Sequence, residues 1–376
     1  MASPKITVVQ TLPALNVGGV ERGTVDVAVE LVRRGHRAIV ISKGGRLVQE
    51  LTAAGVEHIL LEIGEKSLFT LRHVKPLRKL FHATRADIIH ARSRLPAWIT
   101  YLAWKGMGLE ARPRFITSVH GPYTVNAYSG IMVRGERVIA ISEFIKDYIL
   151  YNYPKADPAK IVVIPRGVDA GKYIYGYRPE TEWLDRWRSE HPQIQNKFLV
   201  TLPARITRWK GQEDFLKIIH LLKTRGESVH GIIAGGAENK QFGFLEKLKR
   251  LSAKLGITND VTFLGHRDDL REIMSVSDLV LSLAREPEAF GRTALEALSL
   301  GIPVIAYDHG GASEVLGAMF PEGRVPPWDF EAAAGLIYKF RQSPPVVPEG
   351  NPYTLEKMLD KTIALYESCC KSGHGR

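Results

Sequence analysis

The chain has 376 residues and a formal net charge of +11 at pH 7, with 45% hydrophobic and 24% charged residues. This composition is that of a soluble globular protein, and the length favours two domains over one. The two cysteines, Cys369 and Cys370, are adjacent, which excludes a disulfide framework and indicates a reducing compartment. No apolar run approaches the roughly 20 residues that span a bilayer, and no signal-peptide core is present, so we expect a cytoplasmic protein.

The positive charge is concentrated in the first half of the chain. Residues 1–180 contain 26 Lys and Arg against 15 Asp and Glu, whereas residues 181–376 contain 25 of each. This asymmetry points to an anionic partner on one face, such as a membrane surface, a nucleic acid or an acidic acceptor.

Strands and helices alternate through the first half, as they do around a parallel sheet. We predict a strand at 5–9, a helix at 20–34 and a strand at 38–42, with Gly18 and Gly19 just before the helix. Because Gly-x-Gly-x-x-Gly is missing, the glycine pair is weak evidence for a dinucleotide site and fits a tight turn equally well. Further strands are predicted at 56–61, 87–91, 115–119 and 137–141.

The segment 69–85 is predicted to be a helix with two faces. Its apolar residues recur at helical spacing, and basic residues cover much of the remaining surface. One interpretation is a helix packed on the core with a solvated basic side, and the other is a surface helix that binds anionic lipid. The residues that we expect to face a membrane are Arg72, Lys75, Arg78 and Lys79.

His120 is a candidate substrate-contacting residue. It follows the predicted strand 115–119 and precedes Gly121 and Pro122. A lone histidine is usually structural, but one at the carboxyl end of a parallel strand is well placed to meet a substrate. Further on, the polar and aromatic stretch 171–196 is predicted to be a linker.

A second alternating set begins with a predicted strand at 198–202. Arg205 and Lys210 follow it and would converge on a phosphate at the end of that strand, although a solvated basic loop is the alternative. Gly235 and Gly236 follow the next predicted strand, where they would let a base or ribose approach the backbone. A strand at 302–307 and a terminal helix at 353–369 complete the set.

The most informative stretch of the second half joins a predicted buried strand at 278–283 to a helix at 293–300. Gly291 lies at the bend between them. In a parallel α/β sheet such a loop lies at the carboxyl end of the strand, where ligands bind. The free N–H groups of Gly291, Arg292 and Thr293 point out of the helix start, which favours anions and phosphate above all.

Two glutamates flank this expected anion site. Glu288 stands just before it, where a carboxylate would repel phosphate, and Glu296 lies one turn inside the helix. A carboxylate at the second position can accept two hydrogen bonds from a vicinal diol such as a ribose. Either glutamate alone is equally well explained by its favourable interaction with a helix N-terminus.

The combination of strand, Glu288, Phe290-Gly291, helix and Glu296 resembles the donor-site motif of retaining glycosyltransferases with the GT-B architecture, the group-1 (family 4) type. The resemblance covers the chain almost end to end. It implies that Glu288 lies by the transferred sugar, that Phe290, Gly291, Arg292 and Thr293 belong to the donor site, and that Glu296 binds the ribose of a sugar nucleotide.

The same resemblance extends to motifs outside this stretch. It implies that Arg205 and Lys210 clamp the donor diphosphate and that His120 lies near the donor sugar. Gly18 and Gly19 match the glycine pair that lets the backbone approach the diphosphate. Ile161 to Asp169 resembles the family's Pro-Asn-Gly-Val-Asp segment, with Arg166 in place of the asparagine.

The predicted fold class is therefore α/β, with two Rossmann-like domains whose parallel sheets face each other across a cleft. Residues 1–180 would bind the acceptor and residues 181–352 the nucleotide-sugar donor, while residues 353–376 would cross back to the first domain. No Asp-x-Asp occurs in the chain, so we expect neither a metal nor any other cofactor.

The function implied by the resemblance is transfer of a hexosyl group from a nucleoside diphosphate sugar, preferably UDP-hexose, to an acceptor hydroxyl with retention of configuration. We expect the acceptor to be an envelope glycolipid or glycan, such as a lipopolysaccharide core, reached by peripheral binding to the inner face of the cytoplasmic membrane. No nucleic-acid partner is expected. A sugar-nucleotide epimerase, a phosphorylase of the same architecture and a non-enzymatic module for anionic lipid are the alternatives.

Overall fold

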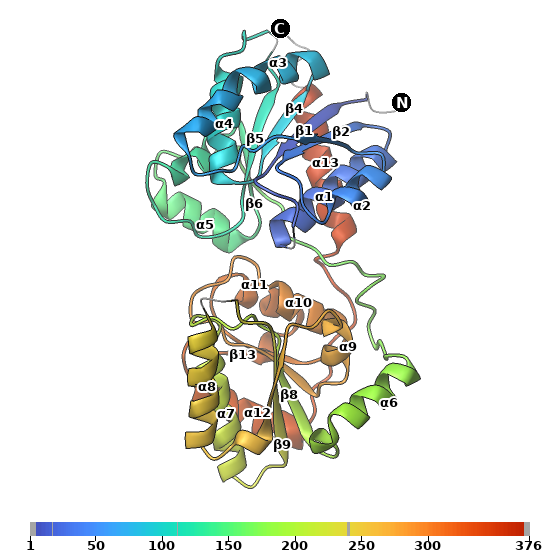
Figure 1. Ribbon diagram of the computed structural model, residues 1–376. Coiled ribbons are helices and arrows are strands. Elements are labelled where there is room, and N and C mark those ends of the chain that lie inside the picture. Colours follow the sequence, from blue (N-terminus) through green and yellow to red (C-terminus); the bar gives the residue numbers. More distant parts are fainter. Residues whose placement is uncertain (1–4, 17, 111, 239–240, 372–376) are drawn as a thin grey trace. The chain divides into compact units, whose positions relative to one another are not determined.

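The computed structural model describes residues 5–16, 18–110, 112–238 and 241–371. The chain forms two compact units, which we call unit 1 (Met1–Pro165 with Glu356–Arg376) and unit 2 (Arg166–Leu355). Each unit contains a parallel sheet with helices around it, as Figure 1 shows. The prediction of an α/β fold with two parallel sheets is confirmed.

Unit 1 contains a seven-stranded sheet in the order β3-β2-β1-β4-β5-β6-β7. Every neighbouring pair is parallel, and β1 pairs with β2 on one side and with β4 on the other. The strands are β1 (Thr7–Thr11), β2 (Arg37–Ser42), β3 (Glu57–Leu60), β4 (Ile88–Ala91), β5 (Arg114–Val119), β6 (Arg137–Ala140) and β7 (Ile161–Val163).

The helices of unit 1 connect these strands in the usual crossover manner of parallel sheets. They are α1 (Gly19–Arg33), α2 (Val48–Ala53), the 3-10 helix η1 (Leu68–His73), α3 (Val74–Thr84), α4 (Arg94–Lys105), η2 (Ser129–Val133), α5 (Glu143–Asn152), η3 (Pro158–Lys160) and the terminal α13 (Leu355–Lys371). The predicted helix at 69–85 is thus a 3-10 turn followed by an α-helix, because η1 runs directly into α3.

Unit 2 contains a six-stranded parallel sheet in the order β10-β9-β8-β11-β12-β13. Its strands are β8 (Phe198–Leu202), β9 (Val229–Ala234), β10 (Val261–Gly265), β11 (Leu279–Ser282), β12 (Val304–Tyr307) and β13 (Arg324–Val325). Its helices are α6 (Thr181–Glu190), η4 (Pro192–Ile194), α7 (Gln212–Thr224), α8 (Phe242–Lys254), η6 (Thr258–Asp260), α9 (Leu270–Ser275), α10 (Arg292–Ser299), α11 (Gly310–Met319), η7 (Pro321–Gly323) and α12 (Phe330–Gln342).

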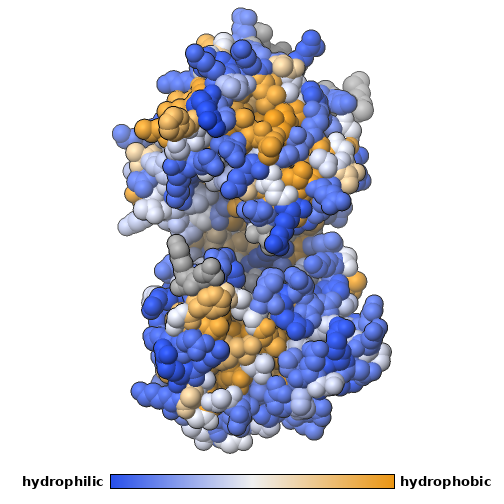
Figure 2. Space-filling model, viewed as in Figure 1, coloured by the Kyte–Doolittle hydropathy of each residue, from blue (hydrophilic) through white to orange (hydrophobic). Residues whose placement is uncertain are grey.

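Central strands of both sheets are buried along almost their whole length. All residues of β4, β9 and β12 are buried, as expected for strands covered by helices on both faces. Exposed hydrophobic surface on both units is broken up by hydrophilic areas, as Figure 2 shows. None of the helices formed by the described residues combines the length and the hydrophobicity that a membrane span needs.

The order of strands reverses once in each sheet. In unit 1 this switch point lies between β1 and β4, and in unit 2 it lies between β8 and β11. At a switch point the loops after the two neighbouring strands run in opposite directions, which opens a crevice at the carboxyl ends where ligands of α/β proteins bind. The two switch points are therefore the first places to look for a site.

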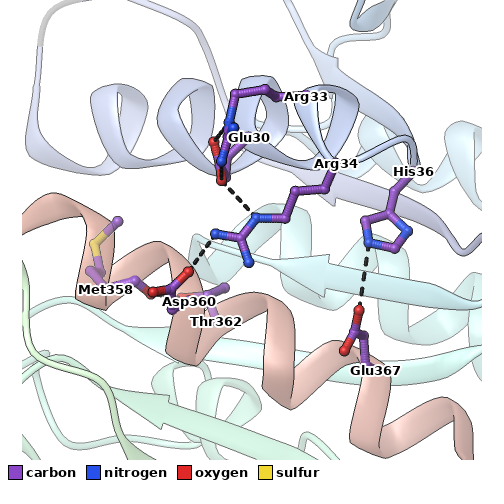
Figure 3. Close-up of polar contacts among 8 residues, drawn as sticks. All are labelled: Glu30, Arg33, Arg34, His36, Met358, Asp360, Thr362 and Glu367. Carbon is purple, nitrogen blue, oxygen red and sulfur yellow. Dashed lines mark hydrogen bonds and ion pairs between the residues drawn. The ribbon is translucent and has the colours of Figure 1, made fainter. Parts of the chain in front are cut away.

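The C-terminal helix α13 packs on unit 1. Arg34, at the end of α1, donates to Asp360 of α13 and to Glu30, as Figure 3 shows. His36 Nε2 lies 3.7 Å from Glu367 Oε1 in the same figure. Tyr366 is fully buried, and the two contacts join the last helix to the segment between α1 and β2.

The boundary between the units differs from the predicted position at residue 180. Gly176 N donates to Leu300 O at 3.0 Å, and Tyr175 Oη donates to Val347 O at 2.7 Å, so the preceding loop packs on unit 2. Helix α6 buries Trp183 and Trp187 in the core of the same unit. The aromatic residues of the predicted linker 171–196 explain the difference, because they supply core contacts of unit 2.

Candidate active site

The loop between β11 and α10 lies at the switch point of unit 2. Gly291 is the N-cap of α10 and has φ of +74°, in the left-handed region that favours glycine. A Cβ at position 291 would lie 2.5 Å from Ala312 Cα, so the close packing of α11 also requires glycine here. The bend predicted from the sequence thus presents the first turn of α10, with Arg292 and Thr293, at the carboxyl edge of the sheet.

Lys210 and Glu288 meet at this edge and form an ion pair. Their side chains are 20% and 14% exposed, so the pair is shielded from water on most sides. Ser282 Oγ donates a longer hydrogen bond to Glu288 at 3.4 Å, and Lys210 Nζ lies 4.2 Å from the centre of the Trp209 ring. Lys210 and Glu288 line one narrow recess together with Thr293, so three predicted donor-site residues converge.

Buried polar contacts hold the two loops that carry this pair. Arg285 Nε donates to Asp214 Oδ2 at 3.1 Å, and Tyr307 Oη donates to the same oxygen at 3.1 Å. Asp214 is fully buried in α7. Arg285 N also donates to Trp209 O at 2.7 Å, which ties the loop after β11 to the loop after β8. Neither Arg285 nor Asp214 was predicted as a site residue, since the two are 71 positions apart.

Glu296 lies one turn inside α10 and is buried, at 7% exposure. Arg292 Nε donates to Glu296 Oε1 at 2.8 Å. Burial, followed by the charge of the nearby Glu296, raises the pKa of the Tyr173 phenol. Tyr173 therefore stays protonated beside Glu296. Tyr173 was not predicted, since it lies far from Glu296 in the sequence.

Phe290 contributes to packing rather than to an open surface. It is 5% exposed, and its ring meets Tyr353 edge to face with centroids 5.6 Å apart. A side chain at Gly311 would run into the Phe290 backbone, and Gly311 N donates to Glu288 O at 2.7 Å. Phe290 thus anchors the loop whose neighbouring residues form the recess.

Arg205 and the two glycines after β9 lie in the loops next to this recess. The Arg205 side chain is 72% exposed, and its guanidinium lies 3.7 Å from the Glu238 carboxylate. A side chain at Gly235 would run into the backbone of Ala204, while a Cβ at Gly236 would lie 3.2 Å from His266 Cβ. At least Gly235 is therefore required by packing between two loops, which is a different reason from the predicted approach of a base or ribose.

The predicted residues of unit 1 lie at the carboxyl edge of its own sheet. Gly18 is the N-cap of α1 and has an extended backbone conformation. A Cβ added at Gly19 would have no other heavy atom within 4 Å. His120 follows β5 directly, is half-buried, and donates from its backbone N to Tyr123 Oη at 3.3 Å. Packing against the described residues does not require glycine at position 19, so the predicted approach of a ligand remains open there.

Three of the four predicted membrane-facing residues are exposed. Arg72 belongs to η1, and Lys75 and Lys79 to α3. Arg78 differs, because its Nε donates to Ala103 O at 3.3 Å and its guanidinium covers Gly106 at the end of α4. Arg78 is therefore less exposed than the other three residues, since its side chain contacts the C-terminal end of a neighbouring helix.

The described residues contain no group of three or more His, Cys, Asp or Glu side chains arranged to hold a metal ion. The charged side chains at the switch point of unit 2 include Lys210, Glu288, Glu296, Arg205 and Arg292, which lie beside the first turn of α10. Cations and helix N–H groups can bind a diphosphate directly, and a buried carboxylate can accept hydrogen bonds from a diol.

Comparison with known proteins agrees with this arrangement. The family model described as Glycosyltransferase Family 4 matches residues 17–172, and that described as Glycosyl transferases group 1 matches residues 185–345. A solved glycosyltransferase of Rickettsia africae is 32% identical, with 98% of this chain and 99% of that chain covered and a TM-score of 0.85. The chain belongs to the group-1 glycosyltransferases of family 4. It is thus an enzyme of a family that uses nucleotide-sugar donors.

Two further solved structures share the GT-B fold with this glycosyltransferase. Anabaena HepE, solved in complex with UDP and glucose, is 20% identical, with 98% of this chain and 97% of that chain covered and a TM-score of 0.74. WaaG, a glycosyltransferase involved in lipopolysaccharide biosynthesis, is 15% identical, with 98% and 100% covered and a TM-score of 0.66. At these identities the likeness establishes the fold, which confirms the predicted GT-B class.

Proposed function

We propose that this enzyme transfers a hexosyl group from a UDP-hexose to a hydroxyl of an envelope glycolipid or glycan, with retention of the anomeric configuration. The observation that carries the proposal is the Lys210–Glu288 pair beside the first turn of α10, at the switch point of unit 2. One place then offers a cation and N–H groups for a diphosphate and a carboxylate for the attached sugar.

The diphosphate leaving group needs stabilisation as its negative charge develops. Lys210 and the N–H groups of Gly291, Arg292 and Thr293 would provide it, with the exposed Arg205 as a second cation. Donors that are held in place before the reaction do not have to reorganise during it, which makes them effective. Glu296 would release its hydrogen bond from Arg292 and would then accept hydrogen bonds from the two hydroxyls of the ribose.

At the reacting carbon, the bond from C1 of the hexose to the diphosphate oxygen breaks and a bond from the acceptor oxygen to C1 forms. In this proposal the acceptor attacks on the face from which the phosphate departs, and a phosphate oxygen takes the acceptor proton. Glu288 would orient the sugar and stabilise an oxocarbenium-like state. His120 is predicted to contact the same sugar, and Gly18 and Gly19 the diphosphate.

The preference for UDP, hexose and an envelope acceptor draws on related structures. HepE was solved in complex with UDP and glucose, and WaaG is involved in lipopolysaccharide biosynthesis. Both proteins share the fold of this enzyme over nearly its whole length. The excess positive charge of the first half of the chain suits an acceptor at an anionic membrane.

Membrane binding would use the end of unit 1 that contains η1. Arg72, Lys75 and Lys79 are exposed there, and Leu68 and Phe69 are 86% and 80% exposed. Basic residues attract anionic headgroups, and neighbouring apolar side chains can enter the interface between headgroups and acyl chains. We therefore propose peripheral attachment through this surface.

A thermal-shift screen followed by product analysis tests the proposed function. UDP and UDP-glucose should raise the midpoint of thermal unfolding more than the GDP and ADP counterparts, since ligand binding stabilises the folded state by mass action. Slow release of glucose and UDP from UDP-glucose without acceptor should follow. An epimerised sugar nucleotide without UDP release would indicate an epimerase instead, and a strict need for inorganic phosphate would indicate a phosphorylase.

A further inference from the structure

Arg94 lies at the switch point of unit 1, where it begins α4 just after β4. Its guanidinium carbon lies 4.9 Å from the centre of the Tyr123 ring and 5.5 Å from that of Tyr128. Nη1 donates to Ser129 Oγ at 3.2 Å. An arginine placed over aromatic faces has a fixed plane, so its fork of N–H donors points in a fixed direction.

The charge of Arg94 is not neutralised within the chain. In the part of the chain that the structure describes, no carboxylate lies within ion-pair distance of its guanidinium, and its one hydrogen bond goes to a neutral hydroxyl. Arg92, two residues earlier, is buried and donates from Nε to the neutral Gln10 side chain at 2.6 Å. Burial lowers the pKa of the Arg92 guanidinium, and Tyr366 and Asp26 oppose this shift.

The rings beneath Arg94 are themselves held in place. The backbone N of His120 donates to Tyr123 Oη at 3.3 Å, and Tyr148 Oη donates to Tyr123 O. Trp98 Nε1 donates to Tyr128 O at 2.8 Å. The loop that carries both tyrosines is thus fixed at several points, and Tyr123 connects Arg94 directly to His120.

A second arginine of the same unit shows what a purely structural contact looks like. Arg112 lies 4.5 Å from the centre of the Trp104 ring, a comparable cation–π contact. However, Nη2 of Arg112 donates to Lys105 O at 3.0 Å and to Met107 O at 2.8 Å, so its donors are used to terminate α4. Among the described residues, the Arg94 side chain donates to no backbone carbonyl, which leaves most of its fork available to a ligand.

We propose that Arg94, supported by Tyr123 and Tyr128, binds the anionic oxygens of a phosphate or carboxylate group on the acceptor, so that the acceptor is an acidic sugar. A guanidinium binds either group through two parallel charge-assisted hydrogen bonds. This inference rests on the proposed function, which assigns His120 to the transferred sugar. Because a single tyrosine connects Arg94 to His120, the anionic group belongs on the sugar that is glycosylated or on the adjacent one.

Binding of simple anionic sugars in the presence of saturating UDP tests this subsite. UDP fills the donor site, so that phosphate is not captured by Lys210. Glucose 6-phosphate, glucuronate and neutral glucose are then titrated by ligand-observed NMR into the full-length protein and its variants. The native protein should bind at least one anionic sugar about 10-fold or more tightly than glucose. Arg94→Gln should lose that advantage, Arg94→Lys should retain part of it, and Arg112→Gln should keep all of it.

The two anionic probes distinguish a phosphate from a carboxylate as the group recognised. Equal affinities of native protein and Arg94→Gln for both anionic sugars, or an equal loss in Arg112→Gln, would overturn the proposal. If the thermal midpoint shows that Arg94→Gln does not fold, Arg94→Lys becomes the deciding variant. An affinity of Arg94→Lys for the anionic sugars equal to that of the native protein would then contradict a contact through the guanidinium fork. Failure of UDP to bind would contradict the proposed function alone, and the anionic sugars would then be titrated without UDP.

Discussion

The two switch points of this glycosyltransferase occupy equivalent places in their sheets but differ in how their charges are balanced. In unit 2, Lys210 is paired with Glu288 and Arg292 with Glu296. In unit 1, Arg94 lies over two tyrosine rings without a carboxylate partner among the described residues. One site is neutralised by its own side chains, whereas the other keeps its positive charge.

This difference suggests that the two ligands enter in different ways. In the proposed donor complex a diphosphate would replace the carboxylates that hold Lys210 and Arg292, so binding would exchange one set of charge-assisted hydrogen bonds for another. The exchange would free Glu288 beside the sugar and Glu296 beside the ribose. An anionic acceptor would meet Arg94 already oriented and would have no internal ion pair to break.

The largest expected effect concerns Glu288. Glu288→Ala should lower turnover by roughly 10²-fold or more, because Glu288 stabilises the transition state in the proposed mechanism. Initial rates of UDP-glucose hydrolysis and of transfer measure the change. Glu286→Ala is the matched control, because this exposed glutamate lies two residues away. Similar rates in both variants would show that Glu288 takes no part in the reaction and serves only as a counterion of Lys210.

The next effect compares the paired cation of unit 2 with its exposed neighbour. Lys210→Ala should weaken UDP binding by roughly 10- to 100-fold, the scale of lost hydrogen bonds to a charged group, and Arg205→Ala should weaken it less. Calorimetry measures both.

Activity should also survive a chelator, because these cations and the start of α10 neutralise the diphosphate. A rate that collapses in EDTA and returns with magnesium would contradict this account.

Glycine substitutions sharpen the comparison at the level of the backbone. Gly291→Ala should destabilise the protein by about 1–3 kcal/mol from its left-handed backbone alone, and the clash with Ala312 adds to this. Gly19→Ala, at the first residue of α1 in unit 1, should leave stability unchanged because its Cβ meets nothing within 4 Å. Denaturant unfolding of the two variants is the measurement. Equal loss of stability would show that both turns are required by packing.

The smallest effects concern the surface of unit 1. Each of Arg72, Lys75 and Lys79 should contribute about 1 kcal/mol to the binding of anionic vesicles. Changing all three to Gln should therefore weaken cosedimentation without altering UDP affinity. Arg78→Gln should matter less, since Arg78 donates to Ala103 O. Equal binding to neutral and anionic vesicles, or none to either, would refute the electrostatic attachment.

Local sequence patterns predicted much of the fold and the position of the donor loop. The apolar run that forms β11, the glycine at the bend and the spacing of the two glutamates are all short-range features, so Gly291 and Glu296 were located from a single stretch. Apolar runs of strand length likewise predicted most strands, because central strands of a parallel sheet are buried on both faces. Comparison of whole chains then supplied the family.

Contacts between distant segments could not be predicted. Lys210 and Glu288 were assigned separately to diphosphate and sugar, but they meet across 78 positions. Tyr173 contacts Glu296, and Arg78 turns to the end of α4, for reasons that only packing reveals. The aromatic residues of the predicted linker belong to the core of unit 2. This was not predicted, because the polar residues between them obscure their helical spacing.

The most direct test of the donor site is the UDP affinity of two carboxylate variants, measured by calorimetry. Glu296→Ala should weaken UDP binding by about 1–3 kcal/mol, because it removes an acceptor for the ribose. Glu288→Gln should bind UDP as tightly as the native protein or more tightly, because it removes the carboxylate that competes for Lys210. The account predicts weaker UDP binding in the variant inside α10, and unchanged or tighter binding in the variant of the preceding loop. Native UDP affinity in Glu296→Ala, or weaker binding in Glu288→Gln, would contradict it.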